Sequence, residues 1–216
     1  MVSELRVAFH QQLQAIEGKI IQLFAFVSED LAVATEALLN GDADAVQVIS
    51  EREAVIDSVQ RELEHVVNNQ LALQAPVATD LRLVLSALRI VPELERSHDL
   101  VEHIAEHATH VLSDDLSPRA RGLLQRMGDI GGEMWNRAAD AWYQRDGAAA
   151  VALEERDDDL DSLHSAIMAE LASGKMSLPV AMDMTLVARY YERLGDHAVN
   201  IARRVVYLAG GEPHPD

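Results

Sequence analysis

Apolar residues recur at spacings of three and four along nearly the whole chain, and Ala, Leu, Val and Glu dominate between the breaks. This spacing matches the turn of an α-helix, and no stretch alternates between apolar and polar residues as a strand would. Residues that break helices are few and well separated. The pattern therefore predicts an all-α protein built from six long helices.

Short polar segments interrupt this pattern and set the predicted helix ends. The first helix, about 36 residues long, should end at Asn40, because Gly41 suits the left-handed position after a helix and Asp42 suits the next N-cap. A glycine-rich stretch, Gly128–Gly132, could kink or split the fourth helix. The other interruptions lie at Gln74–Asp80, Ser113–Pro118, Arg145–Gly147 and Ser173–Pro179.

An internal repeat divides the six helices into two sets of three. At an offset of 104 residues, Ala34–Ser58 matches Ala138–Ser162 at 8 of 25 positions. At an offset of 97, Glu95–Ala105 matches Glu192–Ala202 at 5 of 11. The repeat predicts two tandem, pseudo-symmetric three-helix bundles. The predicted parts are a first bundle at residues 1–112, a linker at 113–118, a second bundle at 119–209 and a disordered tail at 210–216.

Each repeat carries two pairs of acidic residues four positions apart, which places both members of a pair on one side of a helix. A single pair means little, because 36 acids in 216 residues would produce about six such spacings by chance. A solvated helix face is then the simpler explanation. The four pairs are Glu53 with Asp57, Glu95 with Asp99, Asp157 with Asp161, and Glu192 with Asp196.

The heights of the pairs along the two predicted hairpins argue against chance. Glu53 and Asp57 precede Pro76 by 23 and 19 residues, and Glu95 and Asp99 follow it by 19 and 23. In an antiparallel hairpin that turns at this proline, the two pairs face each other. The second hairpin repeats the arrangement around its own turn, where the first acid of one pair again opposes the last acid of the other.

The pairs also lie on faces where charge is costly. Glu53 and Asp157 fall within the apolar arcs of their helices, whereas Glu192 lies at the edge of its arc and Asp196 just beyond it. Like charges about 4 Å apart cost about 4 kcal/mol at an effective dielectric near 20. Protonation, arginine partners or a bound cation would relieve this repulsion. We expect two all-carboxylate metal sites, one in each repeat, with arginine-paired acids as the main alternative.

Composition narrows the chemistry further. The absence of cysteine excludes disulfides, thiolate zinc sites, iron–sulfur clusters and cysteine nucleophiles. A net charge of −18 opposes binding to nucleic acid or to an anionic membrane, but suits hard cations or a basic protein partner. With no apolar segment of membrane-spanning length and no signal-peptide pattern, we expect a soluble, intracellular protein.

Histidines close to the acidic pairs are weaker candidates for metal binding. His103 lies one turn beyond Asp99 and could be a ligand, but the simpler explanation is that Pro92 kinks the helix and turns His103 to solvent. His197 follows Asp196 and should point about 100° away from it, towards a supporting position or the surface.

An enzymatic function has little support, since the sequence contains no nucleophile elbow, glycine-rich phosphate loop or dinucleotide fingerprint. The alternative is a di-iron or di-manganese carboxylate bundle with an oxidase or metal-storage role, which would use Glu-x-x-His pairs. Glu62 with His65 and Glu95 with His98 fit that spacing. Their heights in the first hairpin differ by roughly 16 Å, so they could not share one cluster.

Two motifs carry a family resemblance. "LALQAPVATDLR" at Leu71–Arg82 and "ERLGDHAVNIARR" at Glu192–Arg204, together with the acidic pairs, resemble the PhoU family of phosphate-transport regulators. The resemblance covers about residues 5–209. In the first repeat, "ERSHDLVEHIA" has His98 where the family usually has glycine.

The resemblance implies a cytoplasmic, non-enzymatic regulator. Such a protein would be an adaptor between the ATPase subunit of a phosphate ABC transporter and a two-component sensor histidine kinase, repressing phosphate-starvation genes when phosphate is plentiful. It would reach the membrane only through its partners and form a homodimer. It would hold Fe, Mn, Mg or Zn, singly or in multinuclear clusters, on its acidic motifs. We take the acidic face with Glu29, Asp30 and Glu36 as a candidate docking surface.

Overall fold

The computed structural model describes residues 2–74, 76–109 and 115–210, with side chains placed at 7, 9–69, 76–109 and 115–210. The described residues form long helices and one short 3₁₀ turn, with no strand among them, which confirms the predicted all-α class of six helices. The elements are α1 (Val2–Asn40), α2 (Asp44–Gln74), α3 (Ala78–Glu106), η1 (His107–Thr109), α4 (Pro118–Gln144), α5 (Gly147–Leu171) and α6 (Leu178–Gly210).

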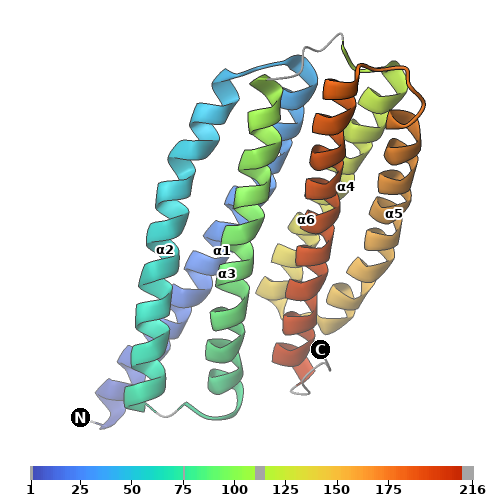
Figure 1. Cartoon of the computed structure of the whole chain (residues 1–216). Coiled ribbons are helices and arrows are strands. Elements are labelled where there is room, and N and C mark those ends of the chain that lie inside the picture. The colour runs from blue at the N-terminus through green and yellow to red at the C-terminus, as the bar shows by residue number, and fades with distance from the viewer. Residues whose placement is uncertain (1, 75, 110–114, 211–216) are drawn as a thin grey trace.

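The helix axes are roughly aligned, and helices that follow each other in a hairpin run in opposite directions (Figure 1). α2 lies at one edge of the molecule and α5 at the other. Both predicted hairpins are present, because α2 packs on α3 and α5 packs on α6. The two repeats meet where α1 contacts α4 and α3 contacts α6. None of the described helices is long and apolar enough to cross a membrane.

One continuous apolar core joins the two repeats, with buried residues from all six helices in a single cluster. The rings of Phe24 in α1 and Trp135 in α4 lie 6.1 Å apart within it. Thr35 in α1 also forms a 2.7 Å hydrogen bond with the Tyr191 hydroxyl in α6. The division into two bundles stays a prediction, and residues 110–114 and 211–216, which include part of the expected linker and tail, lie outside the described residues.

The helix ends follow from local chemistry. α1 ends at Asn40 as expected, and Gly41 adopts a left-handed φ of +71°. The Asp42 carboxylate accepts a 3.0 Å hydrogen bond from the backbone N–H of Asp44, the first residue of α2. Ser117 and Asp146 cap α4 and α5 in the same manner, by accepting hydrogen bonds from backbone N–H groups of the first turn.

Gly128–Gly132 does not split the fourth helix, since α4 is continuous. Gly128 instead lets α4 approach α1 closely. A Cβ atom at this position would lie only 2.5 Å from Cγ2 of Thr35. Pro92 likewise lies inside α3 without ending it.

Candidate metal centres

The first acidic cluster lies between α2 and α3, and the structure brings together the residues expected at equal heights. The charge of Asp99 is one cause of a raised pKa at Glu53, its counterpart across the hairpin. Burial raises the pKa of Glu95, and the charges of Asp99 and Asp57 add to the effect. Burial also raises the pKa of Asp99, against the opposing charge of His103. The four predicted acids therefore share one electrostatic environment.

A fifth acid, Glu102, belongs to this cluster and was not among the predicted ligands. It is the largest cause of the raised pKa of Glu53, through both its charge and a hydrogen bond. Its Oε1 also accepts a hydrogen bond from the Ser50 hydroxyl. The sequence does hold a signal for this contact, since Glu102 follows Pro76 by 26 residues and Ser50 precedes it by 26.

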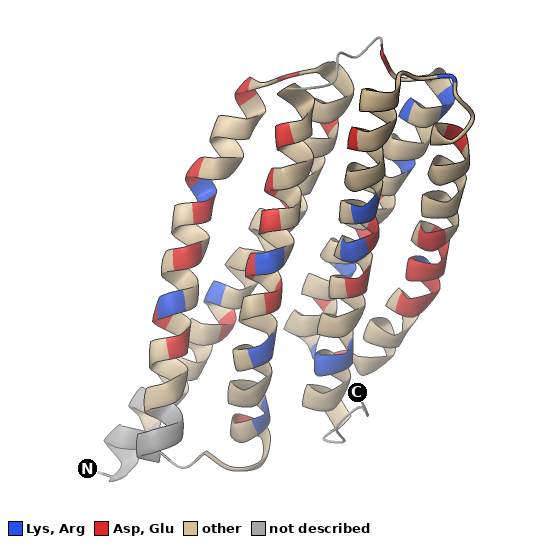
Figure 2. Cartoon of the chain, viewed as in Figure 1, with Lys and Arg blue, Asp and Glu red and all other residues tan. Residues whose placement is uncertain are grey.

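The second acidic cluster lies between α5 and α6, in a part of α5 where Figure 2 shows acidic residues gathered about halfway along the helix. Burial, followed by the charges of Asp161, Asp196 and Glu192, raises the pKa of Asp157 to about 6. Burial and the charge of Asp196 also raise the pKa of Glu192. Gly195 allows this approach of α5 to α6, since a Cβ there would lie 2.5 Å from Oδ1 of Asp157.

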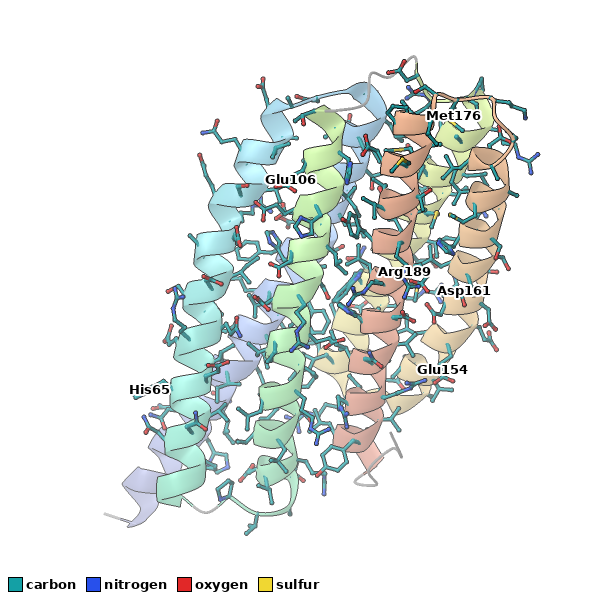
Figure 3. All side chains as sticks on the ribbon, in the orientation of Figure 1. His65, Glu106, Glu154, Asp161, Met176 and Arg189 are labelled. Atoms are coloured by element: carbon teal, nitrogen blue, oxygen red, sulfur yellow. The ribbon has the colours of Figure 1, made fainter. Side chains whose placement is uncertain are left out.

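Arginine side chains pair with only two of the eight predicted carboxylates among the described residues. Asp57 pairs with Arg61 at 3.3 Å and Glu192 pairs with Arg189, each within its own helix. For the other six predicted ligands, the described residues provide no ion pair. Six of the eight side chains are half-buried, while Asp161 and Asp196 are exposed, so the second cluster is the more open of the two. Figure 3 labels Asp161 on α5 and Arg189 on α6.

The donor atoms suit a hard cation, because they are all carboxylate oxygens. One of them, Oε2 of Glu192, is buried without a hydrogen-bond partner, which is a site that a cation could satisfy. Within the described chain, however, no three Asp, Glu or His side chains converge closely enough to hold one ion. Charges interact over longer distances than coordinate bonds, so rotation of the side chains would be needed. Metal binding by the eight residues therefore stays a prediction.

Asp30 is not on the surface, so its inclusion in a docking face was wrong. Its side chain is buried and faces α3, where Oδ2 lies 3.0 Å from Nε2 of His98. Oδ1 accepts a 2.6 Å hydrogen bond from Arg52 in α2. This polar network ties α1, α2 and α3 together next to the first cluster, since Arg52 and His98 immediately precede Glu53 and Asp99. It also engages His98, which the Glu-x-x-His alternative requires as a ligand.

The remaining histidines near the clusters have other contacts. His103 is half-exposed, and its Nδ1 lies 3.1 Å from Oε2 of Glu106. Its ring lies 5.6 Å from that of Tyr190 in α6. His197 is buried and not on the surface, with Nδ1 at 3.0 Å from the Ser97 hydroxyl of α3. His197 therefore links the two repeats.

The two repeats differ at one buried pair of positions. By the repeat offsets of 104 and 97, Asp30 corresponds to Met134 and His98 corresponds to Gly195. In the second repeat, a Cβ at Gly195 would lie 3.7 Å from Cε of Met134. A methionine over a glycine thus occupies the place where the first repeat has a buried aspartate–histidine pair.

The sequence of this chain is similar to those of a known protein family. The family model described as the PhoU domain matches residues 20–108 and 124–205, one segment in each repeat. The chain is 34% identical over 215 residues to the Mycobacterium leprae "Phosphate-specific transport system accessory protein PhoU homolog 1", covering 96% of this chain and 95% of that protein. A similarly named Zymomonas mobilis homologue is 30% identical and covers 97% and 90%.

Two crystal structures share the fold. PhoU from Pseudomonas aeruginosa superposes with a TM-score of 0.87 at 27% identity, covering 94% of this chain and 100% of that one. The phosphate transport system regulatory protein PhoU from Streptococcus pneumoniae gives 0.87 at 25% identity, covering 96% and 99%.

Proposed function

The chain belongs to the PhoU family, and on that premise we propose that it is a metal-binding, non-enzymatic regulator of phosphate uptake. It acts in the cytoplasm as an adaptor between the ATPase subunit of the phosphate transporter and a sensor histidine kinase. In this role it represses phosphate-starvation genes when phosphate is plentiful. The names of its relatives, accessory proteins of phosphate-specific transport systems, support the connection with transport.

The observation that carries the metal-binding part is the recurrence of one acidic cluster in each repeat. Both clusters raise the pKa of their own members, and few of those members have basic partners. A bound Fe, Mn, Mg or Zn ion, alone or in a multinuclear cluster, would neutralise this charge. The chain's own contribution is to hold α2 against α3 and α5 against α6, so that the carboxylates need only local rotation to converge.

Metal content of single variants tests this proposal. Asp99→Asn should lose metal chiefly from the first cluster and Asp196→Asn chiefly from the second, while the exposed Asp140→Asn should retain the full amount. Metal should also stabilise the fold by about 2.7 kcal/mol at 100 times its dissociation constant, so a chelator should lower Tm. If both cluster variants keep the metal content of the unmodified protein, the two-site assignment is wrong.

The adaptor role needs a protein-docking surface. Glu36 is exposed on α1 and has no ion-pair partner within the described residues, whereas Glu29 is exposed but pairs with Arg52 at 3.2 Å. Both line a groove of about 1200 Å³ between α1 and α4. With a net charge of −18, the chain should bind proteins and not operator DNA.

Pull-down with the transporter ATPase and the kinase at two salt concentrations tests the docking surface. Glu36→Lys should weaken capture while leaving metal content unchanged. Deletion of the protein should derepress phosphate-uptake genes in phosphate-rich medium, and sedimentation should reveal a homodimer. Tight, salt-sensitive binding to promoter DNA with neither protein captured would contradict the proposal.

The alternative of a carboxylate oxidase or metal-storage bundle is less well supported, because His98 is already bound to Asp30. Aerobic addition of Fe(II) separates the two functions. Catalytic oxygen consumption, or uptake of many iron atoms per chain, would favour the alternative.

A further inference from the structure

A cleft of about 440 Å³ lies between α3 and α6, where the two repeats meet. Figure 2 shows basic residues on both of these helices. Four arginines line the cleft, two from each helix, and one glutamate accompanies them. The charged lining residues are Arg89, Glu93 and Arg96 of α3 and Arg203 and Arg204 of α6.

The charge of this cleft is opposite to that of the molecule. The chain has 36 acidic and 18 basic residues, yet the lining of the cleft has a net formal charge of +3. Guanidinium groups held together repel one another, and they do so more strongly next to protein than in open water. An anion bound among them would convert this repulsion into attraction.

Several of the guanidinium groups retain free hydrogen-bond donors. Arg89 has no carboxylate partner in the part of the chain that the structure describes. Arg96 reaches Glu93 at 3.4 Å, and Arg203 reaches Glu154 at 3.6 Å, so both pairs are loose. An arginine has five N–H donors, of which a single loose pair uses few. The cleft therefore offers donors in excess of its acceptors.

The shape and lining of the cleft match a small phosphorylated molecule. Its volume lies within the range of small-molecule sites. Arginine binds phosphate oxygens through two parallel N–H donors, a geometry that lysine cannot provide. The apolar part of the lining, beside the arginines, could contact the organic part of a phosphate ester. The accessible apolar residues are Leu88 and Pro92, because the side chains of Ile90 and Ile201 behind them are buried.

The cleft also adjoins the second acidic cluster. A neighbouring hollow of about 350 Å³ is lined by Asp157 and Asp196 of that cluster and by Arg193. It shares Arg203 with the cleft, so a continuous polar surface leads from the arginines to the acids. An anion in the cleft would lie close enough to alter cation binding at these acids through its charge.

We propose that the α3–α6 arginine cleft binds a multiply charged phosphate anion, either free inorganic phosphate or the phosphate group of a phosphorylated metabolite. Its regulatory meaning rests on the proposed function, because a phosphate site would let a regulator of phosphate uptake sense its ligand directly. The binding itself is independent of that function. Metal content and partner capture could remain as proposed even if no anion bound.

Calorimetric titration of the full chain tests the site, with inorganic phosphate and ADP as separate probes and poly-glutamate as the protein-like competitor. Arg89→Gln and Arg96→Gln should each weaken phosphate or ADP binding by at least about tenfold, as expected for loss of a charge-assisted hydrogen bond. The control is Arg126→Gln, an exposed arginine of α4 outside the cleft, which should change affinity by less than about twofold.

The two probes distinguish the source of the phosphate group. Comparable binding of both assigns the site to phosphate itself, whereas much tighter binding of ADP assigns it to phosphorylated metabolites. Affinity should fall as salt is added, since the contacts are exposed. The proposal is overturned if neither probe binds in the millimolar range, if Arg89→Gln binds as tightly as Arg126→Gln, or if only poly-glutamate binds.

Discussion

Replacing Asp157 by asparagine should stabilise the metal-free protein at pH 8, although it removes a proposed metal ligand. The pKa of this carboxyl is raised from 3.8 to about 6 by burial and by its acidic neighbours. An acid with a raised pKa binds its proton more tightly in the folded state. The folded state therefore loses stability as the pH rises from 3.8 through about 6, and at pH 8 the ionised carboxylate imposes its full penalty.

The size of the effect follows from the two pKa values. Their difference corresponds to about 3 kcal/mol, because one pKa unit is about 1.4 kcal/mol. The second cluster is partly open to water, and screening reduces this figure to about 1–2 kcal/mol. Asparagine has nearly the same shape and no charge. At pH 8, Asp157→Asn should therefore raise the free energy of unfolding by about 1–2 kcal/mol, which corresponds to an increase in Tm of roughly 2–8 °C. This gain should vanish near pH 4.

Urea unfolding after chelation measures this difference, with the fluorescence of the buried Trp135 and Trp142 as the signal. Asp140→Asn serves as the control, because it removes one exposed negative charge outside both clusters and should change little. With metal restored the order should reverse, since only the unmodified protein keeps all its ligands. A stability difference between Asp157→Asn and the unmodified protein that is the same at pH 4 and pH 8 would refute the reasoning.

Substitutions at Gly128 and Asp30 test the packing, with Gly132→Ala as the control for the first. Gly128→Ala should lower the free energy of unfolding by about 1–3 kcal/mol, because its Cβ would clash with Thr35. Gly132→Ala, in the same helix, meets no atom within 4 Å and should raise the free energy of unfolding by about 0.5–1 kcal/mol. Equal effects of the two variants in urea unfolding would contradict this. Asp30→Ala should cost about 3–5 kcal/mol, because it removes the buried acceptor of His98, and a loss below 1 kcal/mol by thermal unfolding would count against that network.

The fold was predictable because its determinants are local. Gly41 and Asp42 end one helix and begin the next by chemistry that needs no distant partner. The glycines of α4 were misread for the opposite reason. Gly128 is required by Thr35, which lies far away in the sequence and meets it only once α1 packs on α4. A spacing rule cannot distinguish a glycine that breaks a helix from one that lets another helix approach.

The acidic clusters were predictable to the same extent. Counting residues from each turn placed Glu53 opposite Asp99, because the rise of a helix and the symmetry of a hairpin are regular. Glu102 was missed because it belongs to no acidic pair present in both repeats: its counterpart in the second repeat is Val199. It joins the cluster through Glu53 and Ser50. Asp30 was misplaced because it was grouped with the exposed Glu29 and Glu36, whereas its burial depends on partners distant in the sequence, Arg52 of α2 and His98 of α3.

The exchange of a polar pair for an apolar pair between the repeats has a consequence for variation among relatives. A histidine at position 98 facing a methionine would bury an imidazole without a partner, and an aspartate at position 30 facing a glycine would have only Arg52 to neutralise it. Either change alone is costly, so the two positions should co-vary. Relatives with glycine at the position of His98 should have an apolar residue at that of Asp30.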